Sequence, residues 1–148
     1  MKRIILALLL IILLASAWYG YHLYTGKVKS LTVVKSDVSV TAAELVQAFK
    51  TDSSGANRKY LGKIILLTGT IKTVEPESST IVFGNMDSDW SVRCSMDSAY
   101  VNLVATFKPG DSLQIKGNCT GFLEGDFGLG SDIILNRCVI ESNRSLDH

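Results

Sequence analysis

The sequence is poor in the residues from which metal and catalytic sites are built. It has two histidines, His22 near the N-terminus and His148 at the C-terminal end, and neither falls in the region that we expect to fold. Its three cysteines include no C-x-x-C pair of the kind found in zinc sites. No histidine is placed to act as the base of a catalytic thiol, and no two carboxylates stand at a defined spacing beside a base. The composition therefore favours a protein that is not an enzyme and that holds no metal or cofactor.

The sequence also lacks a strong net charge. Fifteen basic and fourteen acidic residues give a formal net charge of +1. A domain that binds nucleic acid through its overall charge is expected to be clearly basic. The near-equal number of basic and acidic residues argues against nucleic acid as a partner, unless the basic residues gather in a local stripe.

A single long apolar run stands at the N-terminus. Lys2 and Arg3 precede an unbroken apolar run over residues 4–15, and aromatic residues follow it up to Tyr24. This order is typical of an export signal or a signal anchor. A helix of about 21 residues would measure roughly 31 Å, which is enough to cross the core of a bilayer. We therefore predict a signal anchor or signal peptide over residues 1–26, with residues 4–24 in the membrane.

Two fates of this segment remain open. Ala15-Ser16-Ala17 has the small residues that a signal peptidase accepts, so cleavage after Ala17 would give a secreted protein. Trp18 would then be a bulky first residue, and we favour retention of the segment as an anchor. Lysines also follow the span, at Lys27 and Lys29, which weakens the prediction of its orientation.

The rest of the chain divides into three parts. We interpret the polar residues 27–39 as a tether, residues 40–141 as one domain, and the polar residues 142–148 as a disordered tail. A region of this size is large enough for one hydrophobic core and too small for two.

The stretch 63–74, KIILLTGTIKTV, has the pattern of a long, bent strand. Its odd positions carry Ile65, Leu67 and Ile71, whereas its even positions change from apolar to polar at Thr68. Gly69 falls at this change, and a glycine inside a strand commonly marks a bulge or a barrel corner. We predict that this strand is shared by two halves of a closed barrel.

Four further strands and three helices complete the predicted domain. Thr41 and Glu44 have the spacing of a capping box, which predicts a helix start at Ala42. Tyr100, Leu103, Val104 and Phe107 recur at helical spacing and predict a helix that plugs one barrel end. The strand 132–140 has no clear inward face. The predicted strands are 63–74, 80–84, 90–96, 112–122 and 132–140, and the predicted helices are 42–51, 54–60 and 98–107.

This order of elements is that of an OB fold. The predicted class is mainly β: a five-stranded barrel with a helix between strands 3 and 4. One or two short helices and an N-terminal transmembrane or signal helix precede the barrel.

Six short segments carry a further pattern: 43–45, 59–63, 68–71, 92–94, 116–121 and 135–138. These segments, most specifically the two that contain Cys119 and Cys138, resemble the bacterial tRNA_anti-like family of OB-fold lipoproteins. The resemblance implies an OB fold and a place in the cell envelope, and it implies no reaction and no ligand. The first cysteine of this chain is Cys94, so we expect attachment through the apolar helix rather than through a lipid, with the domain on the periplasmic side of the inner membrane.

In an exported chain, paired cysteines form disulfides more often than reactive sites. The fourth and fifth predicted strands are antiparallel neighbours, so Cys119 and Cys138 would face each other if both lie on one face. We favour this disulfide. Pairing of Cys94 with either partner, and three free buried thiols, remain alternatives.

Candidate ligand contacts follow from the usual geometry of the fold. OB folds bind oligonucleotides or oligosaccharides on the face of the second and third strands, between two loops. The alternative for Arg93 is that it simply lies on a solvated strand face. The alternative for Trp90 and Phe127 is that they pack in the core or anchor a loop. Nearby carboxylates such as Asp87 oppose phosphate. The candidate ligand contacts are Trp90, Arg93, Lys116, Phe122 and Phe127.

These observations together predict a membrane-tethered, non-enzymatic binding module of the bacterial cell envelope. Its partner would be a small or oligomeric ligand or an envelope protein. Two alternatives remain: an OB-fold protein that binds single-stranded nucleic acid, and a structural or stress-protective envelope module.

Overall fold

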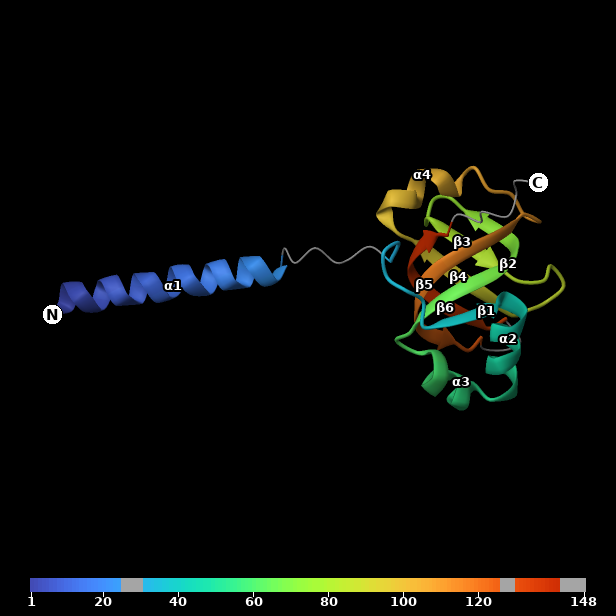
Figure 1. The fold of residues 1–148 in the computed structure, drawn as a ribbon, viewed down its shortest axis with the longest axis horizontal. Coiled ribbons are helices and arrows are strands. Elements are labelled where there is room, and N and C mark those ends of the chain that lie inside the picture. The colour runs from blue at the N-terminus through green and yellow to red at the C-terminus, as the bar shows by residue number, and fades with distance from the viewer. Residues whose placement is uncertain (25–30, 126–129, 142–148) are drawn as a thin grey trace.

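The computed structural model describes residues 1–24, 31–125 and 130–141. Helix α1 (Lys2–Tyr24) stands at the N-terminus, and all later described elements belong to a β-rich domain (Figure 1). Within α1, the window Ile4–Tyr21 has a mean hydropathy of 2.3, and none of it is buried. The helix is long and apolar enough to cross a membrane, a criterion that a signal sequence also meets.

Five strands form the closed barrel that the sequence predicts. The strand order is β2-β3-β4-β6-β5, and pairing between β2 and β5 closes the circle. β4 and β6 run parallel, and the other neighbours in the barrel run antiparallel. Each of these five strands agrees with its predicted range to within one residue at either end. The strands are β2 (Ile64–Glu75), β3 (Thr80–Phe83), β4 (Ser91–Met96), β5 (Ser112–Leu123) and β6 (Asp132–Ile140).

β2 is shared by two walls of the barrel, as predicted. Residues 64–70 pair with β5, and residues 71–75 pair with β3. The partner changes just after Gly69, but the register shift lies between Ile71 and Thr73. A Cβ on Gly69 would lie 2.8 Å from the Cβ of Ala42. The glycine is therefore required by the close approach of the neighbouring helix rather than by a bulge.

The hydrophobic core fills the barrel and continues beneath two helices. Its largest members are fully buried, and each stabilises the fold by about 1.5–3 kcal/mol relative to an exposed side chain. They include Leu45, Phe49, Ile65, Leu67, Ile71, Ile81, Phe83, Val92, Val104, Ile115, Ile133 and Leu135.

A bulge explains why β6 has no clear inward face in the sequence. Ile133 and Leu135 are buried in the regular alternation, and the next fully buried inward residue is Cys138 rather than Arg137. Arg137 has a φ of 56°, and the pairing with β4 shifts between Cys94 and Met96. One extra residue in β6 thus reverses its alternation midway.

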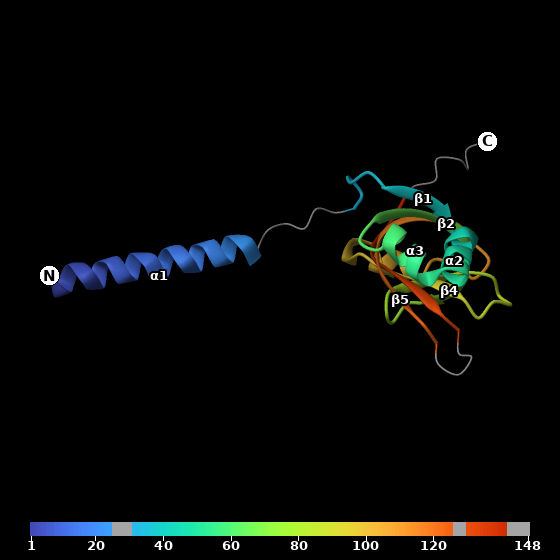
Figure 2. The ribbon, with the colours of Figure 1, turned by 90° about the horizontal axis from the view of Figure 1, so that it is seen from below.

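Two helices cover one end of the barrel (Figures 1 and 2). α2 (Ala42–Thr51) begins at the predicted capping box, where the Thr41 amide donates to Glu44 Oε2 (2.9 Å) and the Glu44 amide donates to Thr41 Oγ1 (3.2 Å). α3 (Ser53–Tyr60) follows after Asp52, which caps it through the Gly55 amide. Both predicted helices are confirmed.

The helical segment at the opposite end is shorter than predicted. A 3-10 turn, η1 (Ser98–Tyr100), leads into α4 (Val101–Val104). Val104 is fully buried, but Leu103 is 45% exposed, so its predicted inward position is wrong. Pro109 disfavours helical backbone at the residue before it, and the chain turns there to enter β5.

A sixth strand lies outside the barrel and was missed by the sequence pattern. β1 (Val38–Thr41) pairs in parallel with residues 65–68 of β2 (Figure 2). Just before it, the Asp37 amide donates to the Ile64 carbonyl (2.8 Å), and the Ile64 amide donates to Asp37 Oδ2 (2.9 Å). Residues 38 and 39, interpreted as tether, therefore belong to the sheet.

Candidate functional site

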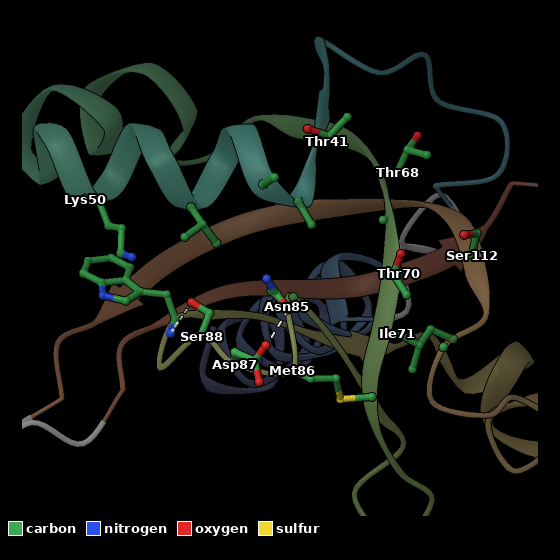
Figure 3. Close-up of a pocket in the computed structure, with 17 residues that line it drawn as sticks. Thr41, Lys50, Thr68, Thr70, Ile71, Asn85, Met86, Asp87, Ser88 and Ser112 are labelled. Atoms are coloured by element: carbon green, nitrogen blue, oxygen red, sulfur yellow. Dashed lines mark hydrogen bonds between the residues drawn. The ribbon is translucent and has the colours of Figure 1, made fainter.

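A groove of about 900 Å³ lies between α2, β2 and the β3–β4 connection (Figure 3). Ala43, Val46 and Lys50 line it from one face of α2, at helical spacing. Thr70 and its neighbours line it from the outer face of β2. The facing wall is the connection over residues 84–90. The groove thus lies where the added helix meets the barrel.

Local hydrogen bonds fix the β3–β4 connection. The Trp90 amide donates to Ser88 Oγ (3.1 Å), and Lys72 Nζ donates to the Ser88 carbonyl (2.5 Å). The Asp87 amide contacts Asn85 Oδ1 at 3.4 Å. Gly84 has a φ of +153°, which a residue with a side chain rarely adopts. These hydrogen bonds hold the connection in one conformation as a wall of the groove, and this wall carries the exposed carboxylate of Asp87 (Figure 3).

An aromatic stack runs from the core to one end of the groove. The ring centroids of Trp90 and Phe122 lie 5.5 Å apart at an interplanar angle of 18°. Phe122 packs in turn on Phe49 at 5.3 Å, and Phe49 packs on Tyr60 at 6.2 Å. The structure thus brings together two predicted ligand contacts, Trp90 and Phe122, and gives both a packing role as well.

Lys50 lies over the outermost ring of this stack. Its Nζ is 5.7 Å from the centroid of the Trp90 ring, a distance at which a cation is attracted by the ring face. Phe122 and the Lys50 ammonium thus both lie against the Trp90 indole. A smaller hollow of about 330 Å³ also borders Lys50 and Trp90 and reaches Asp52 and Glu124.

Lys50 is the site residue that sequence reasoning missed. It follows Phe49 on α2 and carries no motif of its own. The only available signal was that it shares a helix face with Ala43 and Val46. The tertiary position of α2 beside the β3–β4 connection, which a local pattern does not encode, brings it to Trp90.

Two other predicted ligand contacts, Arg93 and Lys116, do not line the groove. Arg93 Nη2 pairs with Glu75 Oε2 at 2.6 Å, and both side chains are about one-third exposed. Lys116 Nζ pairs with Glu141 Oε2 at 2.9 Å, and the lysine side chain is only 7% exposed. Burial removes Lys116 from a ligand face. Phe127 lies outside the described residues.

The three cysteines are buried free thiols. The predicted disulfide between Cys119 and Cys138 is not present, because the β6 bulge places Leu135 opposite Cys119. Cys138 instead lies near Cys94. Burial raises the pKa of Cys94 well above its ordinary value of 9.0, and a hydrogen bond with Cys138 raises it further. Burial also raises the pKa of Cys119, partly offset by a hydrogen bond from the Gly121 backbone.

Within residues 1–24, 31–125 and 130–141, no cluster of three or more histidine, cysteine or acidic side chains could hold a metal ion. The part of the groove lining that the structure describes contains no histidine and no cysteine. What its residues offer is an indole, an ammonium, a carboxylate, an amide and several hydroxyls. These groups are suited to holding a ligand.

Comparisons with known proteins agree with the architecture. The tRNA_anti-like family model matches residues 1–139. A crystal structure from Klebsiella pneumoniae subsp. pneumoniae MGH 78578, described as a candidate nucleic acid-binding lipoprotein, aligns with a TM-score of 0.50 and 16% identity over 70% of this chain and 92% of that chain. A candidate aspartyl-tRNA synthetase from Leishmania major Friedlin aligns with a TM-score of 0.46 and 12% identity over 89% of this chain and 27% of that chain. A comparison with curated proteins finds no match. At these identities, the Klebsiella structure supports the fold alone.

Proposed function

The chain belongs to the tRNA_anti-like family, and from this premise we propose that it is a non-enzymatic binding module of the bacterial cell envelope, tethered to the membrane by α1. Its ligand occupies the groove between α2, β2 and the β3–β4 connection. The observation that carries the proposal is the groove itself. Its volume of about 900 Å³ lies in the range of ligand sites, and it combines apolar residues with a few polar groups.

The length and composition of α1 support the tether. Its 23 residues measure about 35 Å at 1.5 Å per residue, more than the hydrocarbon core of a bilayer. Lys2 precedes the apolar window, as in an anchor that leaves its N-terminus in the cytoplasm. The domain would then face the periplasm. The Klebsiella neighbour is described as a lipoprotein. A lipid there and α1 here would be two different ways to attach a domain of the same fold to a membrane.

Single-stranded nucleic acid is the second candidate ligand, because the Klebsiella neighbour is described as a candidate nucleic acid-binding protein. The charges of the described residues favour it less. Binding to single strands needs a basic groove that follows the phosphates. Here Arg93 and Lys116 each pair with a carboxylate, and Asp87 lines the groove.

Co-purification tests the proposed site. The full chain is solubilised in detergent from the envelope, and native mass spectrometry identifies what remains bound. Ala43→Trp fills the groove from an exposed position of α2, and Ala105→Trp makes the same change at an exposed position at the other barrel end. We expect a ligand on the wild type and on Ala105→Trp that Ala43→Trp has lost. An identical set of bound molecules on both variants contradicts a groove site.

The same preparation separates the candidate ligands. An oligonucleotide that Ala43→Trp loses, with salt-dependent retention on single-stranded DNA, would support the second candidate. The intact mass shows whether α1 is retained. Proteolysis of intact and osmotically opened cells shows which side the domain faces, and protection in opened cells contradicts a periplasmic domain.

A further inference from the structure

Two groups lie against the indole ring of Trp90, and one of them can move. Phe122 stacks on the ring at 5.5 Å, and Lys50 Nζ lies over it at 5.7 Å. Phe122 is part of the packed aromatic stack, whereas Lys50 is exposed on α2. A lysine side chain is flexible, so its ammonium can move aside and admit a ring to the indole face. Lys50 can then pair with an anionic group on the same ligand.

The rest of the groove offers groups that bind hydroxyls. Thr68, Thr70 and Ser112 line it from β2 and β5, and all three are exposed. Asn85 and Asp87 face them from the β3–β4 connection (Figure 3). Thr68 Oγ1 accepts from Gln114 Nε2 at 3.1 Å, which leaves its own proton to donate. Hydroxyl, amide and carboxylate groups thus line a groove that ends at an aromatic ring.

The charges in the groove restrict the ligand. Among the described residues that line the groove, Lys50 is the one cationic side chain and Asp87 is the one carboxylate. A nucleic acid would place a phosphate at every residue of its backbone, including beside Asp87. A phosphate monoester carries close to two charges, whereas a carboxylate carries one. One carboxylate on an otherwise neutral, hydroxyl-rich molecule matches the groove best.

We propose, on the basis of the proposed function, that the groove binds an oligosaccharide with a single uronate residue. One sugar ring stacks on Trp90, the carboxylate pairs with Lys50, and neighbouring sugar hydroxyls bond to Thr70, Asn85 and Asp87. Sugar rings suit such a site because they present apolar C–H faces to an indole and hydroxyls at their edges.

Tryptophan fluorescence tests this assignment on the full chain in detergent. The sequence has two tryptophans, so Trp18→Phe leaves Trp90 as the reporter. The probes are trisaccharides with one terminal glucuronate, galacturonate or mannuronate, and the methyl ester of each. We expect at least one uronate to change the emission and to bind about tenfold more tightly than its ester, as expected for a bond to a charged group.

Two lysine variants make the test specific. Lys50→Gln should reduce the affinity for the uronate about tenfold, to that of the ester. Lys59 also lies over an aromatic ring, at 5.0 Å from Tyr60, but lines neither hollow, so Lys59→Gln should bind like the wild type. Equal binding of acid and ester, an unchanged Lys50→Gln, or no binding by any of the three uronates overturns the assignment. If Ala43→Trp then still removes a co-purified peptide, lipid or nucleic acid, the groove function stands and the sugar class alone is wrong.

Discussion

A Cβ on Gly69 would lie 2.8 Å from the Cβ of Ala42 and 3.3 Å from Cδ1 of Phe83. Ala42 is the first residue of α2, and Gly69 lies in β2 near the point where that strand changes partners. The missing side chain lets the helix rest directly on the strand. This contact brings together α2 and β2, which form two walls of the groove.

Gly69→Ala should therefore destabilise the domain. The added methyl group overlaps Ala42, and overpacking of this kind costs about 1–3 kcal/mol because the helix must move. Urea denaturation followed by circular dichroism measures the loss. The same variant should also weaken ligand retention in the groove.

Gly121→Ala is the matched control for this change. Gly121 also lies in a strand, but a Cβ there would meet nothing within 4 Å. Its free energy of unfolding should stay within about 0.5 kcal/mol of the wild type. If both variants unfold at the same urea concentration, the contact between α2 and β2 does not depend on the glycine.

The barrel could be predicted from the sequence because its strands alternate over long stretches. β2 and β4 show their inward residues directly, and the capping box fixes the start of α2. The inward face of β6 could not be predicted in this way, because the bulge at Arg137 reverses the alternation of the strand. The same bulge is why Cys138 was wrongly predicted to lie opposite Cys119. β1 was missed because four residues give too short a pattern, and its pairing depends on Asp37 and Ile64, far apart in the sequence.

The candidate site was harder to predict than the fold. Trp90 and Phe122 stood out as aromatic residues near strand ends, and the structure stacks them. Arg93 and Lys116 also stood out, but their partners, Glu75 and Glu141, lie 18 and 25 positions away in the chain. The groove arises from the packing of α2 on the barrel, and no local pattern in α2 specifies which residue it faces.

The capping box should make stability depend on acid pH. The pKa of Glu44 is lowered, first by the hydrogen bond from the Thr41 backbone amide and then by the Thr41 side chain. A carboxylate with a lowered pKa stabilises the fold above its ordinary value of 4.5, and this contribution is lost as the pH falls through the lowered folded value. Glu44→Gln should thus have a lower melting temperature than the wild type at pH 7.

Melting temperatures from pH 7 to pH 2.5 check this prediction. The difference between Glu44→Gln and the wild type should shrink towards the acid end, where both side chains are neutral. Thr41→Ser, which keeps the capping hydroxyl, should retain the wild-type profile. A difference that is constant over the whole range contradicts a charge effect.

The buried cysteines should remain thiols. Their burial raises the pKa of Cys94 and Cys119, and the thiolate is the form that reacts. Iodoacetamide at pH 8 should label the native protein far more slowly than the urea-unfolded protein. Unfolding without reductant should expose three thiols. A peptide pair linked through Cys119 and Cys138 in a non-reducing digest would falsify this account and restore the disulfide expected from the sequence.

Arg93 should not be needed for ligand binding in the groove. Its ion pair with Glu75 is about one-third exposed, and pairs of this kind contribute about 0–1 kcal/mol. Arg93→Glu places two carboxylates together, so a small drop in melting temperature is expected. Native mass spectrometry should find the wild-type ligand still bound. Loss of that ligand would return the binding site to the outer face of β3 and β4.

Lys116 and Glu141 form an ion pair. The loss of folding stability when this pair is broken should depend on which partner is changed. The lysine side chain is 7% exposed and the glutamate 41%, so the two charges differ in how far they are removed from water. Glu141→Gln leaves a buried ammonium without its counter-charge, which should cost about 1–3 kcal/mol, below the cost for a fully buried pair because Glu141 is partly solvated. Lys116→Met removes the buried charge and keeps the length of the chain, so it should cost less than Glu141→Gln.

Urea denaturation of both single variants and of the double variant decides the point. The double variant should have a free energy of unfolding close to that of Lys116→Met. Once the lysine charge is gone, Glu141→Gln no longer leaves a buried charge without its partner. Equal costs for the two single variants, added together in the double variant, would mean that water reaches Lys116. The lysine would then be available to a ligand, as the sequence first suggested.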